Sequence, residues 1–377
     1  MKALVFHEVG VIKLEEVPQP KLLKTTDAIV RITKSAICGT DLHMVRGTMS
    51  GMKPGTILGH EGVGIVEEVG PQVRNFKKGD RVVVTSTIAC GSCSYCRSGE
   101  FAQCDKANPN GPRAGTAFFG GPEDSGPFNG MQAEFVRVPF ANVNMVRLPS
   151  EVSDDQAILL SDIFPTGYMA AKNAEIKNGN LVAVFGCGPV GLFSILSARI
   201  LGAGRVFAID RLKDRLDKAR DLGAECVNFD REDPIETLRE LSGGIGPDRV
   251  IDAVGVDAEG PHAKHKKWEP GHAPAKALEW CVRSVRKAGT ISIIGVYGEE
   301  SKSFPIGAAM NKNLTIKMGN CNHRRYVEQL IELVAAGVVE PLDILTQKKS
   351  LGSVVQAYEA FDERKEGWIK VELEPAI

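Results

Sequence analysis

The chain has 377 residues, 43% of them apolar and 25% charged, with 46 basic against 47 acidic side chains. At about 100–200 residues per domain, this length predicts two or three domains with large cores, and it excludes disordered, collagen-like and low-complexity classes. A net charge of −1 offers no bulk attraction for nucleic acid or an anionic membrane surface. The longest apolar run, 181–193, contains Gly and Pro and is shorter than the about 20 residues that span a bilayer. We therefore expect a soluble, cytoplasmic protein that has no nucleic-acid or membrane partner.

The first 150 residues predict a strand-rich domain, because short β-branched segments alternate there with Gly and Pro. The segments are 28–33, 62–70 and 81–85. Residues 104–131 follow a loop composition. Residues 154–172 have a helical pattern, in which Pro165 predicts a break or kink.

From residue 181 onward the pattern changes to a repeat of strand, glycine turn and helix. Six candidate strands separated by helical stretches predict a doubly wound parallel sheet. The strands are 181–185, 205–210, 226–229, 249–253, 290–295 and 314–318. Helical patterns at 326–336 and 352–362 precede a closing strand at 368–373, which we expect to return to the first domain.

A dinucleotide-binding turn is predicted at Gly186-Cys-Gly188-Pro189-Val190-Gly191, because this motif follows an apolar strand and opens a helix. The first Gly permits the tight turn, the second lets a pyrophosphate approach the backbone, and the third lets helix and strand pack closely. The helix N-terminus then offers N–H groups to the phosphates. A glycine-rich turn in a nucleotide-free domain is the alternative.

Asp210 ends the second strand of this sheet, where a carboxylate accepts hydrogen bonds from the ribose hydroxyls and repels a 2′-phosphate. The cofactor predicted is therefore NAD rather than NADP. The neighbouring Arg211 weakens that preference, since an Arg can hold the phosphate.

Four of the nine cysteines are bunched in a C-x2-C-x2-C-x7-C pattern, which predicts a closed tetrahedral zinc site that fastens a loop. They are Cys90, Cys93, Cys96 and Cys104. An iron–sulfur cluster is the main alternative, and disulfides are disfavoured in a cytosolic chain.

Cys38 and His60 form a second candidate metal set, although a Cys and a His 22 residues apart mean little alone. A buried Cys and a core His are the ordinary interpretation of such a pair. The polar residues around them favour a site instead, and these are Thr40, Asp41, His43 and Glu61.

In this order, the Cys38 segment, Gly59-His60-Glu61-Gly62, the four-Cys lobe and the glycine turn resemble the zinc-containing alcohol dehydrogenases of the medium-chain dehydrogenase/reductase superfamily. The resemblance implies a GroES-like catalytic domain, residues 1–164 and 319–377, and a Rossmann domain, residues 165–318. It also implies two zinc ions per chain, NAD, a small alcohol or aldehyde substrate and a homo-oligomer, either a dimer or a tetramer.

The same resemblance implies that Cys38 and His60 bind the catalytic zinc with a third ligand, for which Asp162 occupies the position where a Cys is common. Carboxylate oxygen is an acceptable zinc ligand. The surrounding Ser-Asp-Ile-Phe-Pro-Thr-Gly-Tyr segment is similar to the glutathione-independent formaldehyde dehydrogenase and aldehyde dismutase branch. A long insertion at 256–276 has the position of the loop said to retain NAD in that branch, although a solvated basic loop explains its individual His residues better.

The remaining roles also follow from the resemblance. Thr40 would pass the substrate proton onward and His43 would relay it to solvent, while Asp41 would hold His60 from behind. Glu61 would lie behind the metal, although an internal ion pair is equally plausible for it and for Asp41. The residues expected to touch the nicotinamide are Thr166, Val296 and Tyr297.

These residues predict a zinc-dependent, NAD-linked dehydrogenase for small alcohols or aldehydes, with formaldehyde dehydrogenase or dismutase as the sharper hypothesis. A general short-chain alcohol, polyol or threonine dehydrogenase is the alternative within the enzyme class. A zinc-fastened binding protein without catalysis is the alternative from another class. A zinc-ribbon reader of nucleic acid is disfavoured by the neutral charge.

Overall fold

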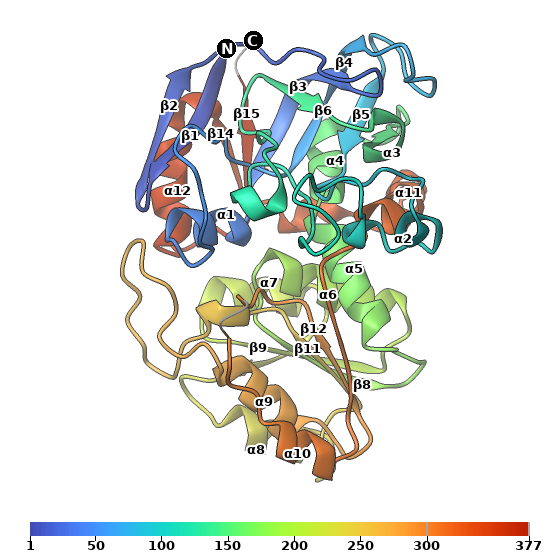
Figure 1. Ribbon diagram of the computed structural model, residues 1–377. Coiled ribbons are helices and arrows are strands. Elements are labelled where there is room, and N and C mark those ends of the chain that lie inside the picture. Colours follow the sequence, from blue (N-terminus) through green and yellow to red (C-terminus); the bar gives the residue numbers. More distant parts are fainter. Residues whose placement is uncertain (299–300, 376–377) are drawn as a thin grey trace. The chain divides into compact units, whose positions relative to one another are not determined.

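The computed structural model describes residues 1–298 and 301–375, which divide into two compact units. The first unit holds Met1–Pro165 and Cys321–Ile377, and the second holds Thr166–Asn320. The first division falls within helix α5 (Ile163–Asn173), directly after Pro165. Both units can be followed by colour along the chain in Figure 1.

The first unit is built on a seven-stranded sheet with the order β14-β15-β3-β4-β5-β7, and β6 pairs with β3 outside this path. A separate antiparallel pair, β1 with β2, opens the chain. The strands are β1 (Lys2–Glu8), β2 (Val11–Glu16), β3 (Ala28–Ile37), β4 (Gly62–Val69), β5 (Arg81–Val84), β6 (Phe135–Val138), β7 (Met145–Arg147), β14 (Gln347–Ser350) and β15 (Val371–Glu374). The strand-rich character predicted for the first 150 residues is confirmed.

The closing strand returns to the first unit, as predicted, because β15 pairs antiparallel with β3 and parallel with β14. In Figure 1 the red strand β15 accordingly lies beside the blue strand β3. The strand begins at Val371 rather than at residue 368. Through this pairing β15 shares a sheet with β3, which leads directly to Cys38.

The helices of the first unit are short and connect the strands or flank the sheet. They are α1 (Gly39–Val45), α2 (Ser94–Arg97), α3 (Ala141–Asn144), α4 (Asp154–Leu160), α11 (His323–Ala335) and α12 (Val354–Asp362), with 3-10 turns at Phe101–Gln103, Glu123–Ser125, Pro341–Ile344 and Leu351–Ser353. The predicted helix at 154–172 is interrupted, but at Ser161 and Asp162 rather than at Pro165. Pro165 has no N–H for the carbonyl four residues earlier, Ser161, so the break falls upstream of the proline.

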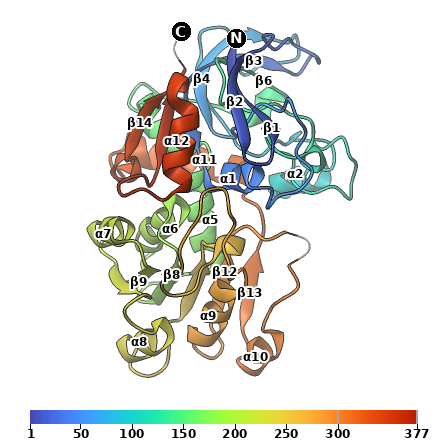
Figure 2. The ribbon, with the colours of Figure 1, turned by 90° about the vertical axis from the view of Figure 1, so that its left-hand side faces the viewer.

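The second unit is a six-stranded parallel sheet with the order β10-β9-β8-β11-β12-β13, the doubly wound arrangement predicted. Its strands are β8 (Leu181–Phe185), β9 (Arg205–Asp210), β10 (Glu225–Asn228), β11 (Arg249–Asp252), β12 (Thr290–Ile293) and β13 (Thr315–Met318). Its helices after α5 are α6 (Pro189–Ile200), α7 (Lys213–Asp221), α8 (Pro234–Leu241), α9 (Lys276–Ser284) and α10 (Ile306–Asn311), with a 3-10 turn at Gly255–Asp257. Helices α6 and α7 pack together, as do α8, α9 and α10, and the two groups cover opposite faces of the sheet (Figures 1 and 2).

Each unit has its own apolar core. In the first, the buried faces of β3, β5 and β6 continue into the lobe that carries three of the buried cysteines, Cys93, Cys96 and Cys104. In the second, β-branched and aromatic residues of the parallel strands pack against α8 and α9, and Trp280 of α9 belongs to this core. No helix within residues 1–298 and 301–375 combines the length and apolar composition that crossing a membrane requires.

Candidate metal centres and cofactor turn

The four thiols of the lobe converge in the first unit. Their sulfur atoms all lie within 4.8 Å of one another, and three of the separations are 3.5 Å (Cys93 to Cys96), 3.9 Å (Cys93 to Cys104) and 4.0 Å (Cys90 to Cys96). An ion with Zn–S bonds of about 2.3 Å in tetrahedral geometry holds its sulfurs about 3.8 Å apart. The cluster therefore has the dimensions of a closed zinc site, and all four cysteines are free rather than paired in disulfides.

Backbone N–H groups prepare these thiols for metal binding. Burial would raise the pKa of the Cys90 thiol, but the Ser92 hydroxyl and the N–H groups of Ser92 and Cys93 donate to its sulfur and lower the pKa to about 6. Cys93 caps α2 and accepts from the N–H of Cys96. Because the thiolate is the form that binds metal, the loop favours the ligating state of Cys90 and Cys93 before the ion arrives, whereas burial raises the pKa of the Cys96 and Cys104 thiols.

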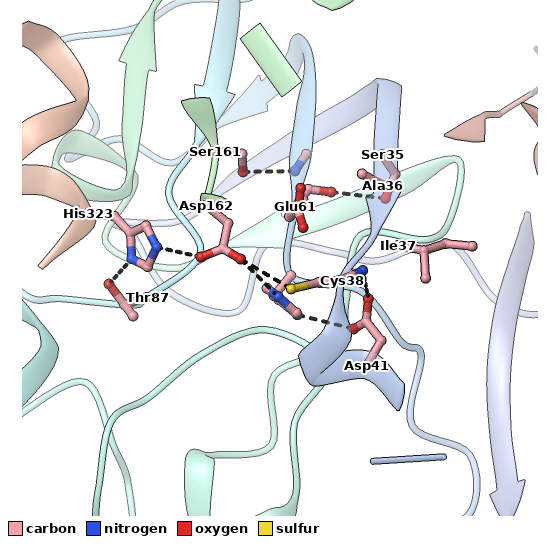
Figure 3. A network of polar contacts seen from close by, with 12 residues as sticks. Ser35, Ala36, Ile37, Cys38, Asp41, Glu61, Thr87, Ser161, Asp162 and His323 are labelled. Atoms are coloured by element: carbon pink, nitrogen blue, oxygen red, sulfur yellow. Dashed lines mark hydrogen bonds and ion pairs between the residues drawn. The ribbon is translucent and has the colours of Figure 1, made fainter. Parts of the chain in front are cut away.

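A second ligand set is assembled from three separate segments of the first unit (Figure 3). Cys38 follows β3 and caps α1, His60 and Glu61 precede β4, and Asp162 lies in the break between α4 and α5. Asp162 Oδ2 is 3.6 Å from Cys38 Sγ and 3.3 Å from His60 Nε2. Tetrahedral zinc with ordinary bond lengths separates such ligand atoms by about 3.6 Å and 3.4 Å. One ion can therefore be held by all three groups.

The charges of this set also fit a bound cation. Burial opposes a charged imidazole, yet the pKa of His60 is raised well above its usual value because two carboxylates and a thiol surround the ring. Burial likewise opposes a charged carboxylate, yet the pKa of Asp162 is lowered well below its usual range by the imidazoles of His323 and His60. Buried anionic groups that stabilise a positively charged imidazole to this extent would also favour a bound metal ion.

The predicted glycine turn joins β8 to α6 in the second unit. Gly186 has a φ of +87°, which only Gly adopts without strain, and a Cβ at Gly191 would lie 1.8 Å from the carbonyl oxygen of Gly186. At Gly188, in contrast, the nearest atom to an added Cβ is 3.7 Å away, on Arg215. The first and third glycines are therefore required by the turn itself, whereas the second keeps the backbone open to a ligand.

Comparisons with known proteins agree on one family. Two family models match, the alcohol dehydrogenase GroES-like domain over residues 24–150 and the zinc-binding dehydrogenase over residues 189–259. The zinc-type alcohol dehydrogenase-like protein AdhB of Bacillus subtilis is 39% identical and is covered over 100% of both chains. The chain belongs to the zinc-containing alcohol dehydrogenases.

Two further relatives are similar to the chain to a comparable degree. The glutathione-independent formaldehyde dehydrogenase of Pseudomonas aeruginosa is 36% identical over 84% of this chain and 80% of its own. The solved alcohol dehydrogenase TADH from Thermus sp. ATN1 matches with a TM-score of 0.87 and 35% identity over 100% of both chains. The predicted fold class, enzyme class and two zinc sites are thus confirmed, and the protein is a zinc-dependent oxidoreductase of the alcohol dehydrogenase type.

In this alcohol dehydrogenase, Asp41 contacts the catalytic ligands from behind. Its Oδ1 is 3.1 Å from His60 Nδ1, and its Oδ2 accepts from the N–H of Cys38 at 2.9 Å. The same oxygen accepts from Gln132, whose own carbonyl oxygen accepts from the Tyr358 hydroxyl. A chain of buried groups therefore fixes the His60 ring and the start of α1.

Glu61 forms the internal ion pair that was the ordinary interpretation for it. Both of its carboxylate oxygens accept from Lys370 Nζ, at 2.6 and 2.7 Å, and neither side chain is exposed. Lys370 also donates to the carbonyl oxygen of Ile37. A Glu61 carboxylate oxygen nevertheless lies within 4.8 Å of the ligand atoms of Cys38, His60 and Asp162, so Glu61 would add negative charge beside a bound ion.

Replacing this buried lysine is expected to destabilise the fold strongly. In Lys370→Met the Glu61 carboxylate stays buried without its cation, which costs about 3–5 kcal/mol of unfolding free energy. Lys348→Met is the matched control, because the Lys348–Asp155 pair is half exposed and such pairs contribute about 0–1 kcal/mol. Urea unfolding of the zinc-loaded variants measures both, and equal midpoints would contradict the expectation.

The two residues predicted for proton transfer lie on α1. Thr40 and His43 are three residues apart, so a single helix face carries both side chains. Thr40 is partly exposed, whereas His43 is only 5% exposed. The helix thus places the hydroxyl nearer to solvent-accessible space than the imidazole.

Asp210 and Arg211 are placed at the carboxyl end of β9. Asp210 Oδ2 accepts from the N–H of Cys187, inside the glycine turn, at 2.8 Å. The Arg211 guanidinium faces Asp230 at 3.5 Å and Glu259 at 3.3 Å. Its charge is therefore shared between two carboxylates rather than offered to a phosphate.

The insertion at 256–276 is connected to the end of β9 through Arg211. Besides contacting Glu259, this Arg donates to the carbonyl oxygen of Ala263. Within it, His265 is 10% exposed and lies 3.3 Å from Glu259, while His262 and His272 are 75% and 54% exposed. None of these contacts gathers the histidines into a metal-binding group among the described residues.

The three residues expected at the nicotinamide all lie in the second unit. Thr166 is in the first turns of α5. The carbonyl oxygen of Val296 accepts from the N–H of Val256 at 2.9 Å, and the Tyr297 hydroxyl donates to the buried Asp252 at 2.7 Å. The segment after β12 is therefore fixed to the segment after β11.

Several residues of the site have no sequence signal of their own. His323, Thr87, Gln132, Tyr358 and Lys370 are all buried around the catalytic ligands. Each comes from a segment far from Cys38, and His323 is 161 residues from the Asp162 that it contacts. Lys370 alone among these five lies in a predicted element, the closing strand at 368–373 that we expected to return to the first domain.

Proposed function

We propose that this protein transfers hydride between NAD and a small alcohol or aldehyde at the zinc site formed by Cys38, His60 and Asp162. The observation that carries the proposal is the 3.3 and 3.6 Å spacing of the three ligand atoms, which leaves one vertex of a tetrahedron for substrate oxygen. We assign catalysis to a domain formed by residues 1–164 and 319–377. Binding of the dinucleotide is assigned to residues 165–318. A panel of alcohols and aldehydes, assayed with NAD and counted zinc, tests the proposal, and two zinc ions without any turnover would contradict it.

The two bound groups supply the reactive chemistry: zinc acts as a Lewis acid on substrate oxygen, and NAD accepts the hydride. The protein contributes position and proton transfer. Thr40 takes the hydroxyl proton from substrate and His43, on the same face of α1, accepts it in turn, while Asp41 keeps the His60 ring in its ligating orientation. Thr166, Val296 and Tyr297 hold the nicotinamide end of the cofactor.

The preference for NAD is supported by the charges around the second strand of the parallel sheet. A 2′-phosphate beside Asp210 would also approach Glu259 and Asp230, which already neutralise Arg211. Like charges disfavour the phosphate, whereas the Asp210 carboxylate can accept from ribose hydroxyls. We therefore expect NAD to support turnover better than NADP.

The glycine turn gives a pair of substitutions with opposite consequences. Gly188→Ala should keep the fold, because its Cβ meets open space, and should weaken NAD binding on the order of tenfold, about 1.4 kcal/mol. Gly191→Ala should instead lower the stability of the second unit by more than the about 1–3 kcal/mol of ordinary overpacking. Calorimetric NAD titration and thermal unfolding measure the two effects, and equal effects in both variants would contradict the assignment.

Formaldehyde is the sharper substrate hypothesis, supported by Asp162 and the 256–276 insertion and by similarity to a formaldehyde dehydrogenase at 36% identity. Hydrated formaldehyde is a gem-diol, so its oxidation gives formate and reduced cofactor. A cofactor retained between turnovers would supply the hydride that reduces a second aldehyde to methanol, so that two formaldehyde plus water would give one formate and one methanol. Product analysis without added NAD tests this, and alcohol oxidation with no acid product would favour a general alcohol, polyol or threonine dehydrogenase.

Assembly and location remain predictions. We propose a homo-oligomer, a dimer or tetramer, in the cytoplasm. Native mass spectrometry reports subunit number, zinc count and retained NAD in one measurement, and a monomer at micromolar concentration would contradict the assembly.

A further inference from the structure

Asp162 uses its two carboxylate oxygens for different partners. Oδ2 faces the ligand atoms of Cys38 and His60, whereas Oδ1 lies 2.6 Å from Nε2 of His323 (Figure 3). An ionised carboxylate only accepts hydrogen bonds, so the imidazole Nε2 carries the shared hydrogen. The oxygen that is turned away from the metal position is therefore held by the protein.

His323 is itself fixed on its other side. Its Nδ1 is 3.1 Å from the Thr87 hydroxyl, and that hydroxyl is 3.3 Å from the carbonyl oxygen of Cys321. The ring is 2% exposed and belongs to the first residue of α11. Figure 3 shows Thr87, His323 and Asp162 as a continuous row that ends at the ligand set.

A carboxylate ligand needs such a partner more than a thiolate does. A thiolate has one donor atom, whereas a carboxylate can rotate and present either oxygen or both. Asp162 also lies in a break between helices, where its backbone is not held by continuous helical hydrogen bonds. A hydrogen bond to one oxygen selects the other as the metal ligand.

The residue before His323 connects this arrangement to the four-Cys lobe. The Asn322 side chain accepts from the N–H of Ala102 at 2.8 Å and donates to Glu100 at 2.9 Å. Glu100 and Ala102 lie four and two residues before Cys104 in the chain. Two consecutive side chains at the start of α11 thus contact the lobe and the catalytic ligand.

We propose that His323 is a positioning residue that makes Asp162 a one-oxygen zinc ligand, and that Asn322 links its position to the four-Cys lobe. The inference rests on the proposed catalytic zinc site but assigns a role to residues outside the ligand set. It explains how a carboxylate serves here in a position where the family commonly has Cys.

The experiment is chelator competition on the zinc-loaded full chain, with the zinc count followed by native mass spectrometry. In His323→Leu we expect one of the two zinc ions to be bound about 10–100-fold more weakly, the usual cost of losing an outer-shell partner, while the lobe ion is retained. His323→Gln keeps an N–H donor near the Nε2 position and should restore most of the affinity. Asn322→Ala should weaken the same ion by a smaller factor.

Cobalt substitution gives a readout that a purely structural role would not move. The visible spectrum of cobalt at the catalytic site should change in His323→Leu and return toward wild type in His323→Gln. In an Asp162→Cys background, where the ligand has a single donor atom, His323→Leu should leave zinc affinity unchanged. A change of equal size in both backgrounds would contradict the positioning role.

The outcomes separate the inference from the function on which it rests. If wild-type protein binds only the lobe zinc, the catalytic site itself fails. If wild type and His323→Leu both hold two ions with equal affinity and equal cobalt spectra, the positioning role of His323 is wrong while the catalytic site survives. If only Asn322→Ala is without effect, the link to the lobe is wrong.

Discussion

Asp162→Ala is expected to lose the catalytic zinc and to reduce kcat/KM for alcohol or aldehyde on the order of 100-fold or more. Outer-shell partners alone are worth about 10–100-fold, and this substitution removes a ligand that contacts the metal position. It also leaves the imidazoles of His60 and His323 without the carboxylate that both approach. The lobe zinc and NAD binding should be unaffected, because neither depends on Asp162.

Asp155→Ala is the matched control for that experiment. This carboxylate lies on α4, the helix directly before the break that holds Asp162, but it pairs with Lys34 and Lys348 away from the ligand set. It should keep both zinc ions and activity close to wild type. If Asp162→Ala kept two zinc ions and full kcat/KM, Asp162 would be no ligand and the proposed mechanism would have to be abandoned.

The parts of this protein that were predictable from sequence are those encoded over short distances. The four cysteines lie within one loop, and the glycine turn lies between one strand and one helix, so spacing alone specified both. The six parallel strands were recognisable because buried β-branched runs alternate with amphipathic helices. The boundaries of these strands differ from the predicted ones by only a residue or two.

The surroundings of the catalytic ligands were not predictable in the same way. Asp162 was identified by resemblance, whereas His323 and Lys370 approach it and Glu61 only because the C-terminal segment folds back onto the first unit. No periodicity distinguishes a His that contacts a ligand from one that packs in a core. The position of the helix break differs less from its prediction. Pro165 predicts the break, but the backbone hydrogen bond that a proline cannot donate would reach Ser161, so the break lies upstream and contains Asp162.

Cys96→Ser is expected to remove the lobe zinc and to lower the stability of the first unit sharply. The thiol is 4% exposed and its sulfur lies 3.5 Å from that of Cys93, so a hydroxyl there leaves three thiolates packed in a core without their ion. Metal binding of about 10–16 kcal/mol in zinc-finger peptides sets the upper limit of the loss, and even 5 kcal/mol would lower Tm by about 10–20 °C for a unit of this size.

The loss of zinc and of stability in Cys96→Ser should be confined to the four-Cys lobe and to the residues that contact it. Cys226→Ser is the matched control, because Cys226 is outside both metal groups and its sulfur donates to the carbonyl oxygens of Leu216 and Ala224, contacts that a hydroxyl can replace. The control should keep both zinc ions and its wild-type Tm, whereas Cys96→Ser should lose one ion and become sensitive to proteolysis within residues 90–120. An unchanged Tm in Cys96→Ser would mean that the lobe ion contributes nothing to the fold. Because Asn322 and His323 connect the lobe to Asp162, loss of the lobe ion in Cys96→Ser should also weaken binding of the catalytic zinc.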